Sequence, residues 1–463
     1  MMQGALPDVA AAIGKTAIVK IQHLAFGLDA HIYVKCEYLN PGGSHKDRVA
    51  LSILRNAEET GLQPGGTIVE ATSGNTGASL AMLAASRGYK CIFVMPDKMS
   101  REKIATLEAF GAHVVVCPTD VEPADPRSYY SVAKAIAASS PDHYYANQYH
   151  NPANPEAHFK STGPEIWEQT GGNIDVLVAG MGTGGTISGA GRFLKEMRPS
   201  IRVVGVDPVG SLYYDLVKSG KLTQAKSYKV EGIGEDFIPS TMNLSILDDV
   251  VQVDDRECFL TTRDLVRREG LFVGGSSGAA VAGALKYARA AKRKENVVVM
   301  LADGANKYLS KVFDDGWMRA NGFLEEQAET VGDLLAKRGR QALVCAHGRD
   351  SVGDIIQTLK RYGISQLPVI DDGQVRGVVI EGDLLRHVVQ DRGALRTPVE
   401  TILRRDYVTV TRSTALERVR QAVDESSAVL AIEGNAILGV ITKIDVIDYV
   451  ATRAAGHEPA ALS

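Results

Sequence analysis

A lysine stands where its amine could act as a nucleophile. Lys46 lies in the stretch YLNPGGSHKDR, after a glycine turn and before a predicted helix that begins near Asp47. The positive potential at a helix N-terminus disfavours an ammonium ion and so lowers the pKa of a lysine placed there. An amine that loses its proton easily can form a Schiff base with a carbonyl compound. The alternative is a surface lysine followed by an ordinary capping aspartate, and the motif alone does not separate the two.

A second segment, ATSGNTG, has hydroxyl and amide side chains between a predicted strand and a predicted helix. Backbone amides and hydroxyl groups at such a junction form a cup for an anion, such as a substrate carboxylate. The candidate residues are Thr72, Ser73, Asn75 and Thr76. A common strand-to-helix turn with a serine or asparagine cap would have the same composition.

A third segment, AGMGTGGTISG, is rich in glycine and follows the predicted strand IDVLVAG. Its backbone can approach a ligand closely, and the helix start and the threonines supply donors, which suits a phosphate monoester. The candidate residues are Gly182, Thr183, Gly184, Gly185 and Thr186. The segment has neither the lysine of a Walker A loop nor the spacing of a dinucleotide-binding fingerprint, which argues against a nucleotide-dependent oxidoreductase. A glycine turn needed only for packing is the alternative.

A fourth segment, FVGGSSGAA, places Ser276 at the predicted start of another helix. Taken alone it is a helix cap after a flexible turn. The segment becomes informative together with the other three, because all four segments precede predicted helices.

The elements around these segments predict an open parallel sheet. Strand-like runs such as TIVEA, CIFVMP, HVVVC and IRVVGVDP alternate with helical stretches from about residue 14 to 315. Strand, glycine turn and helix in this order give parallel β-α-β units in a doubly wound α/β fold. Ligands of such sheets bind at the carboxyl ends of the strands, where the four segments would meet.

The last third of the chain contains an internal repeat. Two stretches share the order helix, strand, turn, strand, Gly, Asp and helix, with Gly377 matching Gly439 and Asp383 matching Asp445, both 62 residues apart. A repeat of this length indicates a duplicated small module. The predicted divisions are a catalytic domain at 1–318, a linker at 319–340, modules at 341–395 and 396–453, and a frayed tail at 454–463.

Composition excludes several classes of function. A formal charge of −4 gives no basic surface for nucleic acid or anionic lipid. We expect no secretory signal and no membrane span. The five cysteines are Cys36, Cys91, Cys117, Cys258 and Cys345. Their scattered spacing predicts buried free thiols in a reducing cytoplasm, without a metal site or a structural disulfide.

In their order and spacing, the four segments resemble the fold type II family of pyridoxal-phosphate (PLP) enzymes, over about residues 10 to 315. The resemblance implies a tryptophan synthase β-like fold in which Lys46 forms the Schiff base. It places the phosphate on Gly182 to Thr186, the cofactor's phenolic oxygen near Asn75 and the ring nitrogen opposite Ser276. A neutral hydroxyl opposite that nitrogen would favour loss of a β-substituent over transamination.

Within that family the chain is similar to the cystathionine β-synthase branch rather than the cysteine synthase branch. The similarity lies in VEGIGEDFIP, NQYHNPANPEAHF, REGLFVGGSSG and the stretch from DGANKYLSK to Trp317-Met318. The implied substrate-binding residues are Thr72, Ser73, Asn75, Thr76, Gln148, Tyr149, Gly232 and Glu235. His45 stands where a small apolar residue is usual, and Glu235 stands where the animal and yeast enzymes have a tyrosine. No counterpart of the haem-binding extension of the animal enzymes is present, so we expect no haem.

The repeats resemble a tandem pair of CBS domains, an α+β (Bateman) module that often binds adenosyl ligands such as S-adenosylmethionine. Thr442 and Asp445 match the ribose-contacting pattern of that module. In the first repeat Asp383 matches, but Ile380 replaces the threonine, which puts that site in doubt. A purely structural, dimerising module is the alternative.

The resemblance implies a transsulfuration lyase of cysteine biosynthesis that condenses serine or O-acetylserine with homocysteine to give cystathionine. Lys46 would also carry the α-proton, and the enzyme would be at least a dimer. A cysteine synthase or a hydrogen-sulfide-producing enzyme is the alternative within the class. An adenosyl-ligand sensor with a degenerate catalytic domain is the alternative outside it, although the intact lysine and glycine segments argue against it.

Overall fold

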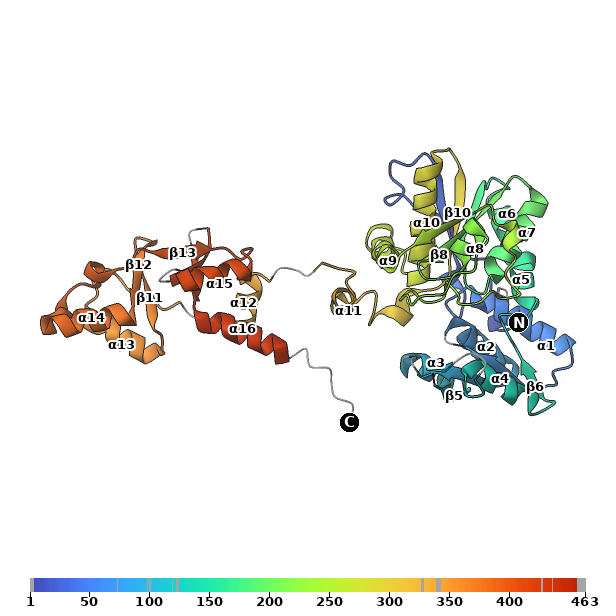
Figure 1. Cartoon of the computed structure of the whole chain (residues 1–463), viewed down its shortest axis with the longest axis horizontal. Helices are drawn as coiled ribbons and strands as arrows, with labels where there is room; N and C mark the ends of the chain where they lie inside the picture. Colours follow the sequence, from blue (N-terminus) through green and yellow to red (C-terminus); the bar gives the residue numbers. More distant parts are fainter. Residues whose placement is uncertain are drawn as a thin grey trace. The chain divides into compact units, whose positions relative to one another are not determined.

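The chain folds into two compact units, residues 1–325 and residues 326–463, which are described separately (Figure 1). The computed structural model describes residues 4–72, 74–97, 99, 101–118, 120–121, 125–325, 329–338, 343–425, 428–434 and 436–455. The predicted α/β class and the internal repeat are both confirmed.

The larger sheet of the first unit has the strand order β1-β2-β10-β7-β8-β9. The strands are β1 (Ile18–Lys20), β2 (His31–Cys36), β7 (Val176–Gly180), β8 (Arg202–Pro208), β9 (Asp249–Val253) and β10 (Asn296–Leu301). All neighbours are parallel except β1, which runs antiparallel to β2. Parallel strands covered on both faces are apolar throughout, as β7 and β10 are.

Helices cover both faces of this sheet. Helices α9 (Asp255–Glu269) and α10 (Gly275–Ala291) pack on one face, and α6 (Gly163–Gln169), α7 (Gly185–Met197) and α8 (Tyr213–Ser219) pack on the other. Helices α5 (Ala153–Ala157) and α11 (Asp315–Ala320) complete this half of the unit.

Helix α10 is buried along most of its length and lies very close to its neighbours. A Cβ atom on Gly278 would lie 2.0 Å from Thr262 Oγ1, and one on Gly283 would lie 2.4 Å from Val206 Cγ2. These glycines therefore permit the close contact of α10 with α9 and with the sheet. Ser276 lies in the first turn of this helix.

The smaller sheet has the order β5-β4-β3-β6, with all neighbouring strands parallel. Its strands are β3 (Thr67–Ala71), β4 (Lys90–Pro96), β5 (His113–Cys117) and β6 (His143–Tyr145). Helices α1 (Lys46–Glu59), α2 (Asn75–Arg87) and α3 (Arg101–Ala109) pack on one face, and α4 (Tyr129–Ala138) packs on the other.

A buried network of charged groups fixes the start of α1 relative to the larger sheet. The Arg48 guanidinium donates to Glu37 at 2.7 and 2.8 Å and to Glu165 at 2.7 and 2.8 Å. Lys35 of β2 donates to the same Glu165 carboxylate at 2.9 Å. Because α1 begins two residues before Arg48, this network also positions Lys46.

The second unit contains the two repeats. The first has strands β11 (Gln366–Asp371) and β12 (Gln374–Ile380), and the second has β13 (Tyr407–Val410), β14 (Ala428–Glu433) and β15 (Ala436–Ile441). Its helices are α12 (Val331–Arg338), α13 (Val352–Tyr362), α14 (Glu381–Gln390), α15 (Leu416–Glu425) and α16 (Lys443–Ala455). Gly377 pairs with Val369, and Gly439 pairs with Ala431, so the two hairpins share one register.

The core of each repeat includes residues from outside that repeat's own predicted limits. Val331 and Leu334 of α12 lie in the core of the second repeat, although they precede the first. Val399, which lies at the start of the second predicted module, belongs to the core of the first. The predicted linker at 319–340 therefore includes a helix that belongs to the core of the module.

Candidate active site

Four helices begin at the predicted chemical segments, and in none of them does the side chain of the N-cap residue cap the helix. Helices α1, α2, α7 and α10 start at Lys46, Asn75, Gly185 and Gly275, with no cap hydrogen bond from His45, Gly74, Gly184 or Gly274. Helices α2, α7 and α10 also have no acidic residue in their first turns. Uncapped amides with partial positive charge favour an anionic ligand.

Side-chain contacts join two of these segments directly, and a third lies beside the loop that contains Glu235. Lys46 Nζ lies 3.3 Å from Thr183 Oγ1, and His45 Nδ1 lies 2.9 Å from Thr186 Oγ1. Ser276 lies beside the 230–235 segment, since a Cβ on Gly232 would lie 3.8 Å from Ser276 Oγ. The structure thus links the lysine to the glycine-rich segment, and Ser276 to the loop that contains Glu235.

Burial lowers the pKa of the Lys46 amine to about 8, while the carboxyl groups of Glu235 and Glu70 raise it. The sequence predicted this direction from the helix terminus, but removal from water is the larger cause, because it disfavours the ammonium form. The site therefore contains an amine that can be neutral near physiological pH.

The glycine-rich segment has no room for larger residues. Gly184 has φ +82°, and a Cβ on Gly185 would lie 1.8 Å from Asn154 Oδ1. Asn154 donates to Thr183 Oγ1 at 3.1 Å, and Thr241 donates to the Thr183 carbonyl at 2.5 Å. These hydrogen bonds from Asn154 and Thr241 hold the loop in place, so its amides and hydroxyls form a fixed cradle. This donor set fits the phosphate of a cofactor.

The residues of the predicted carboxylate segment form hydrogen bonds within the site. Thr72 Oγ1 accepts from the amides of Gly74 at 3.3 Å and Gly77 at 3.2 Å, and Thr76 donates to Gln148 at 2.5 Å. Ser73 lies outside the described residues. Tyr149 packs against Phe237, with ring centroids 5.2 Å apart.

Two carboxyl groups near Lys46 hold their protons unusually well. Burial raises the pKa of Glu70 to about 8. Burial also raises the pKa of Glu235 to about 8, with further increases from Asp236 and Asp207. At neutral pH both groups are therefore mostly protonated, and Glu235 can donate a proton.

An acidic residue that the sequence analysis did not single out anchors Asn75. The buried Asp303 accepts from Asn75 Nδ2 at 2.8 Å and from the Tyr308 hydroxyl at 2.7 Å, and Lys307 donates to Asn75 Oδ1. The DGANKYLSK motif was noted only for its resemblance, since nothing in its spacing indicates that Asp303 meets a helix 228 residues earlier. The other site residues missed from the sequence are Glu70, Asn154, His158 and Tyr213.

In the second unit the predicted ribose-contacting aspartates have protein partners. Asp383 accepts from Arg404 at 2.5 and 3.1 Å and from Arg386, and these arginines lower the pKa of its carboxyl group. Asp445 accepts from the Thr442 amide at 2.8 Å and its hydroxyl at 2.6 Å. Arg338 lies 3.6 Å from Asp445, so both aspartates lie beside an arginine.

Other features of the sequence are also placed. Four of the cysteines are buried as predicted, but Cys345 is exposed, in a stretch without helix or strand. In the part of the chain that the structure describes, no cluster of three metal-ligating side chains occurs. No helix among those residues is long and apolar enough to cross a membrane.

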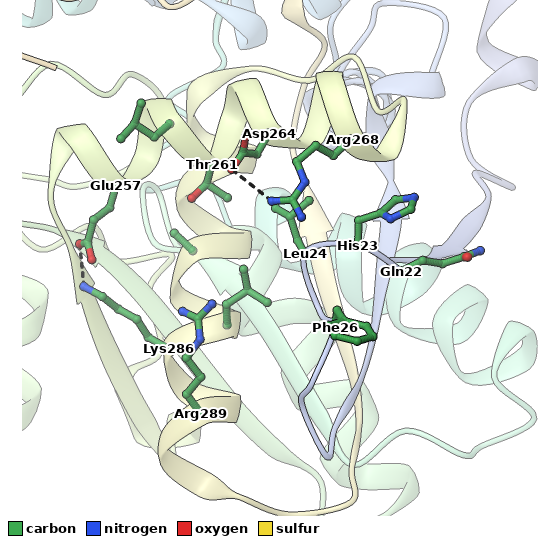
Figure 2. A pocket seen from close by; sticks show the side chains of 13 residues that line it. Gln22, His23, Leu24, Phe26, Glu257, Thr261, Asp264, Arg268, Lys286 and Arg289 are labelled. Carbon is green, nitrogen blue, oxygen red and sulfur yellow. Dashed lines mark hydrogen bonds and ion pairs between the residues drawn. The ribbon is translucent and has the colours of Figure 1, made fainter. Parts of the chain in front are cut away.

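A separate cavity of about 550 Å³ lies between the loop from Gln22 to Phe26 and helices α9 and α10 (Figure 2). Its walls include the ion pair of Glu257 with Lys286. None of the predicted site residues lines it, and its mixed charges indicate no particular ligand.

Comparisons with known proteins agree with this arrangement. A model of the family "Pyridoxal-phosphate dependent enzyme" matches residues 9–303, and the CBS domain model matches residues 331–390 and 399–452. The chain is 38% identical to a cystathionine beta-synthase of Apis mellifera, over 96% of this chain and 91% of that protein. It is 32% identical to a cystathionine beta-synthase of Saccharomyces cerevisiae, over 95% of this chain and 97% of that protein.

Solved structures resemble the first unit. The crystal structure of O-ureido-L-serine synthase has a TM-score of 0.62 and 37% identity, covering 68% of this chain and 99% of that one. A hydrogen sulfide-producing enzyme from Fusobacterium nucleatum has a TM-score of 0.60 and 33% identity, covering 66% and 99%.

Proposed function

Since the chain belongs to the pyridoxal-phosphate-dependent enzyme family, and within it to the cystathionine β-synthases, we propose that it condenses serine with homocysteine to give cystathionine. The observation that carries this proposal is the meeting of a partly buried, easily deprotonated Lys46 with the rigid, uncapped glycine-rich cradle. The catalytic lysine and the phosphate site of this family would have to meet in the same way.

The residues of the first unit fit the cofactor. Lys46 would hold it covalently, Gly182 to Thr186 would bind its phosphate, and Asn75 and Ser276 would contact its ring. The uncapped α7 amides and the clash that a Cβ on Gly185 would cause support this assignment. When bound, pyridoxal phosphate withdraws electrons from the α-carbon of an attached amino acid, which acidifies the α-proton.

The protein's own groups would then move the protons. A Lys46 amine with a pKa of about 8 can accept the α-proton near neutral pH and later return it. A Glu235 carboxyl with a pKa of about 8 can protonate the departing β-hydroxyl group of serine. The hydroxyl leaves as water, the thiol of homocysteine takes its place on the β-carbon, and the thiol proton returns to the Glu235 carboxylate. The segment from Thr72 to Thr76, with Gln148 and Tyr149, would bind the substrate carboxylate.

Absorbance spectroscopy of the purified protein tests the proposal that it is a pyridoxal-phosphate enzyme. We expect a visible band from the lysine-linked cofactor, lost in Lys46→Ala, and cystathionine formation that this variant lacks. A colourless parent protein that takes up no added pyridoxal phosphate would contradict the proposal and favour the adenosyl-sensor alternative.

Cysteine use is a second candidate function. The Fusobacterium relative is a hydrogen sulfide-producing enzyme, and the carboxyl of Glu235 stands where the animal and yeast enzymes have tyrosine. Steady-state rates with serine, O-acetylserine and cysteine, each against homocysteine and sulfide, separate these activities. Sulfide release from cysteine that exceeds cystathionine formation from serine would reassign the main reaction.

The second unit is proposed as a regulatory or dimerising module. S-adenosylmethionine is the first ligand to test at Thr442 and Asp445, since Asp383 is bound by two arginines. The domain limits 1–318, 341–395 and 396–453, a cytoplasmic dimer or larger assembly, and the absence of haem stay predictions. Calorimetric titration, mass photometry and the absorbance spectrum test them.

A further inference from the structure

His45 and His158 flank a single hydroxyl group of the glycine-rich segment. His45 Nδ1 lies 2.9 Å from Thr186 Oγ1, and His158 Nε2 lies 3.1 Å from the same oxygen. On its other side, His158 Nδ1 lies 2.8 Å from Thr162 Oγ1. The His158 ring is buried and the His45 ring is partly buried, and the loss of water lowers the pKa of each imidazole well below its usual value, so both are neutral.

The hydrogen bonds that link His45, Thr186 and His158 have few protons to share. The Thr186 hydroxyl has one proton and two lone pairs, and each neutral imidazole has one N–H. A phosphate dianion only accepts hydrogen bonds, so Thr186 can serve it only by donating its proton. The hydroxyl oxygen is then left as an acceptor, and both histidines can act as donors to it.

One arrangement of protons satisfies every contact. Thr162 donates to His158 Nδ1, His158 donates through Nε2, and His45 donates through Nδ1 to the same Thr186 oxygen. The Thr186 proton then points into the cradle at the start of α7, where Thr186 is the second helical residue. The opposite tautomer of His45 would take this proton and leave none for a ligand.

We propose that His45 is a positioning residue for the cofactor phosphate, which keeps the Thr186 hydroxyl as a donor to it. The proposal rests on the proposed function, since it concerns the same cradle. It also gives a function to the imidazole of His45, which stands where a small apolar residue is usual in the family. An apolar side chain there would leave Thr186 free to turn its proton away from the phosphate.

Cofactor affinity tests the proposal in apo-protein of the parent, His45→Val, Thr186→Val and the double variant, titrated by fluorescence. We expect His45→Val to weaken pyridoxal phosphate binding by about tenfold, the effect of one hydrogen bond to a charged system. Binding of pyridoxal, which lacks the phosphate, should stay within about twofold. In the Thr186→Val background, His45→Val should have no further effect, because the hydroxyl that it orients is gone.

Two further measurements separate positioning from a folding defect. His45→Gln keeps an N–H donor and should recover most of the affinity. Nitrogen NMR of the holo-protein should find His45 protonated at Nδ1, and the phosphorus signal of the bound cofactor should shift in His45→Val but not in His45→Gln. Equal affinity of the parent and His45→Val, or an equal loss with Thr186 absent, would overturn the proposal. A parent that binds no pyridoxal phosphate would instead overturn the proposed function.

Discussion

Replacing Glu235 with glutamine should separate the two possible leaving groups. The hydroxide of serine is a poor leaving group and needs a proton, whereas the acetate of O-acetylserine leaves without one. With a pKa of about 8, about nine in ten Glu235 carboxyls carry a proton at pH 7 and about one in ten at pH 9. In the parent, the ratio of serine to O-acetylserine turnover should therefore fall about tenfold between these pH values when loss of the hydroxyl limits serine turnover, because Lys46 serves both donors and its own titration cancels in the ratio.

Glu235→Gln removes the proton donor but keeps the shape of the side chain. We expect kcat/KM for serine to fall by about a hundredfold or more, the usual contribution of general acid catalysis. The value for O-acetylserine should change by less than about threefold, because its chemistry does not use this proton. Initial rates of cystathionine formation from each donor, measured from pH 6.5 to 9, give both quantities.

The same substitution should stabilise the protein. Unfolding releases the Glu235 proton at neutral pH, since the carboxyl has a pKa of about 8 when folded and 4.5 in its ordinary state. The folded state thus binds more protons, and its stability falls as pH rises from about 4.5 to 8. The cost at pH 7 is about 3 kcal/mol, which glutamine avoids in part. A thermal scan of the full chain should show a higher transition temperature for the variant at pH 7 than at pH 5, relative to the parent.

The refuting results are specific. If kcat/KM falls equally for serine and O-acetylserine, Glu235 acts on a step common to both donors. If the variant keeps the decline of the serine to O-acetylserine ratio above pH 8, another group supplies the proton. Lys46→Ala cannot serve as the control because it removes both reactions. The matched control is Asp236→Asn, an exposed neighbour whose charge raises the pKa of Glu235, so this variant should keep both reactions and show the decline with serine at a lower pH than the parent.

Three further substitutions test other parts of the molecule. Gly185→Ala should abolish cofactor binding, because its Cβ would lie 1.8 Å from Asn154 Oδ1, and retained absorbance would refute the rigid cradle. Ser276→Asp should lower β-replacement and raise side reactions of the cofactor by stabilising a protonated ring nitrogen; an unchanged product profile counts against its assigned place. Arg404→Ala should release Asp383 from its strongest partner, and calorimetry should then find one more S-adenosylmethionine site than in the parent. Unchanged stoichiometry would show that the arginine does not block that site.

The positions of the chemical segments could be predicted because each rests on local rules. A strand, a glycine turn and a helix follow one another in the chain, so the helix starts at Lys46, Asn75 and Gly185 follow from pattern alone. Parallel strands then bring these starts to one edge of the sheets. The four-segment order also indicated the family, which the comparisons confirm.

Contacts between distant parts of the chain could not be predicted in this way. Glu70 reads as a polar residue in an alternating strand, yet it is buried, because the β3 strand is covered on both faces. The pairing of Arg404 with Asp383 joins the second predicted module to the first, and no local signal encodes it. The place of α12 in the core of the second repeat was missed for the same reason, since its sequence resembles a linker.

The tight burial of α10 limits how this enzyme can evolve. A side chain at Gly278 or Gly283 would overlap atoms of neighbouring elements, so the helix tolerates few substitutions. Ser276 lies in the first turn of that helix, so we expect its position to change little as the sequence diverges. Glu235 lies in the segment between α8 and β9, and its side chain is only partly buried, so it can change with less repacking than the buried Ile233 beside it. New donor specificities in this lineage should therefore arise through that loop, while the electronic character of the cofactor site stays constant.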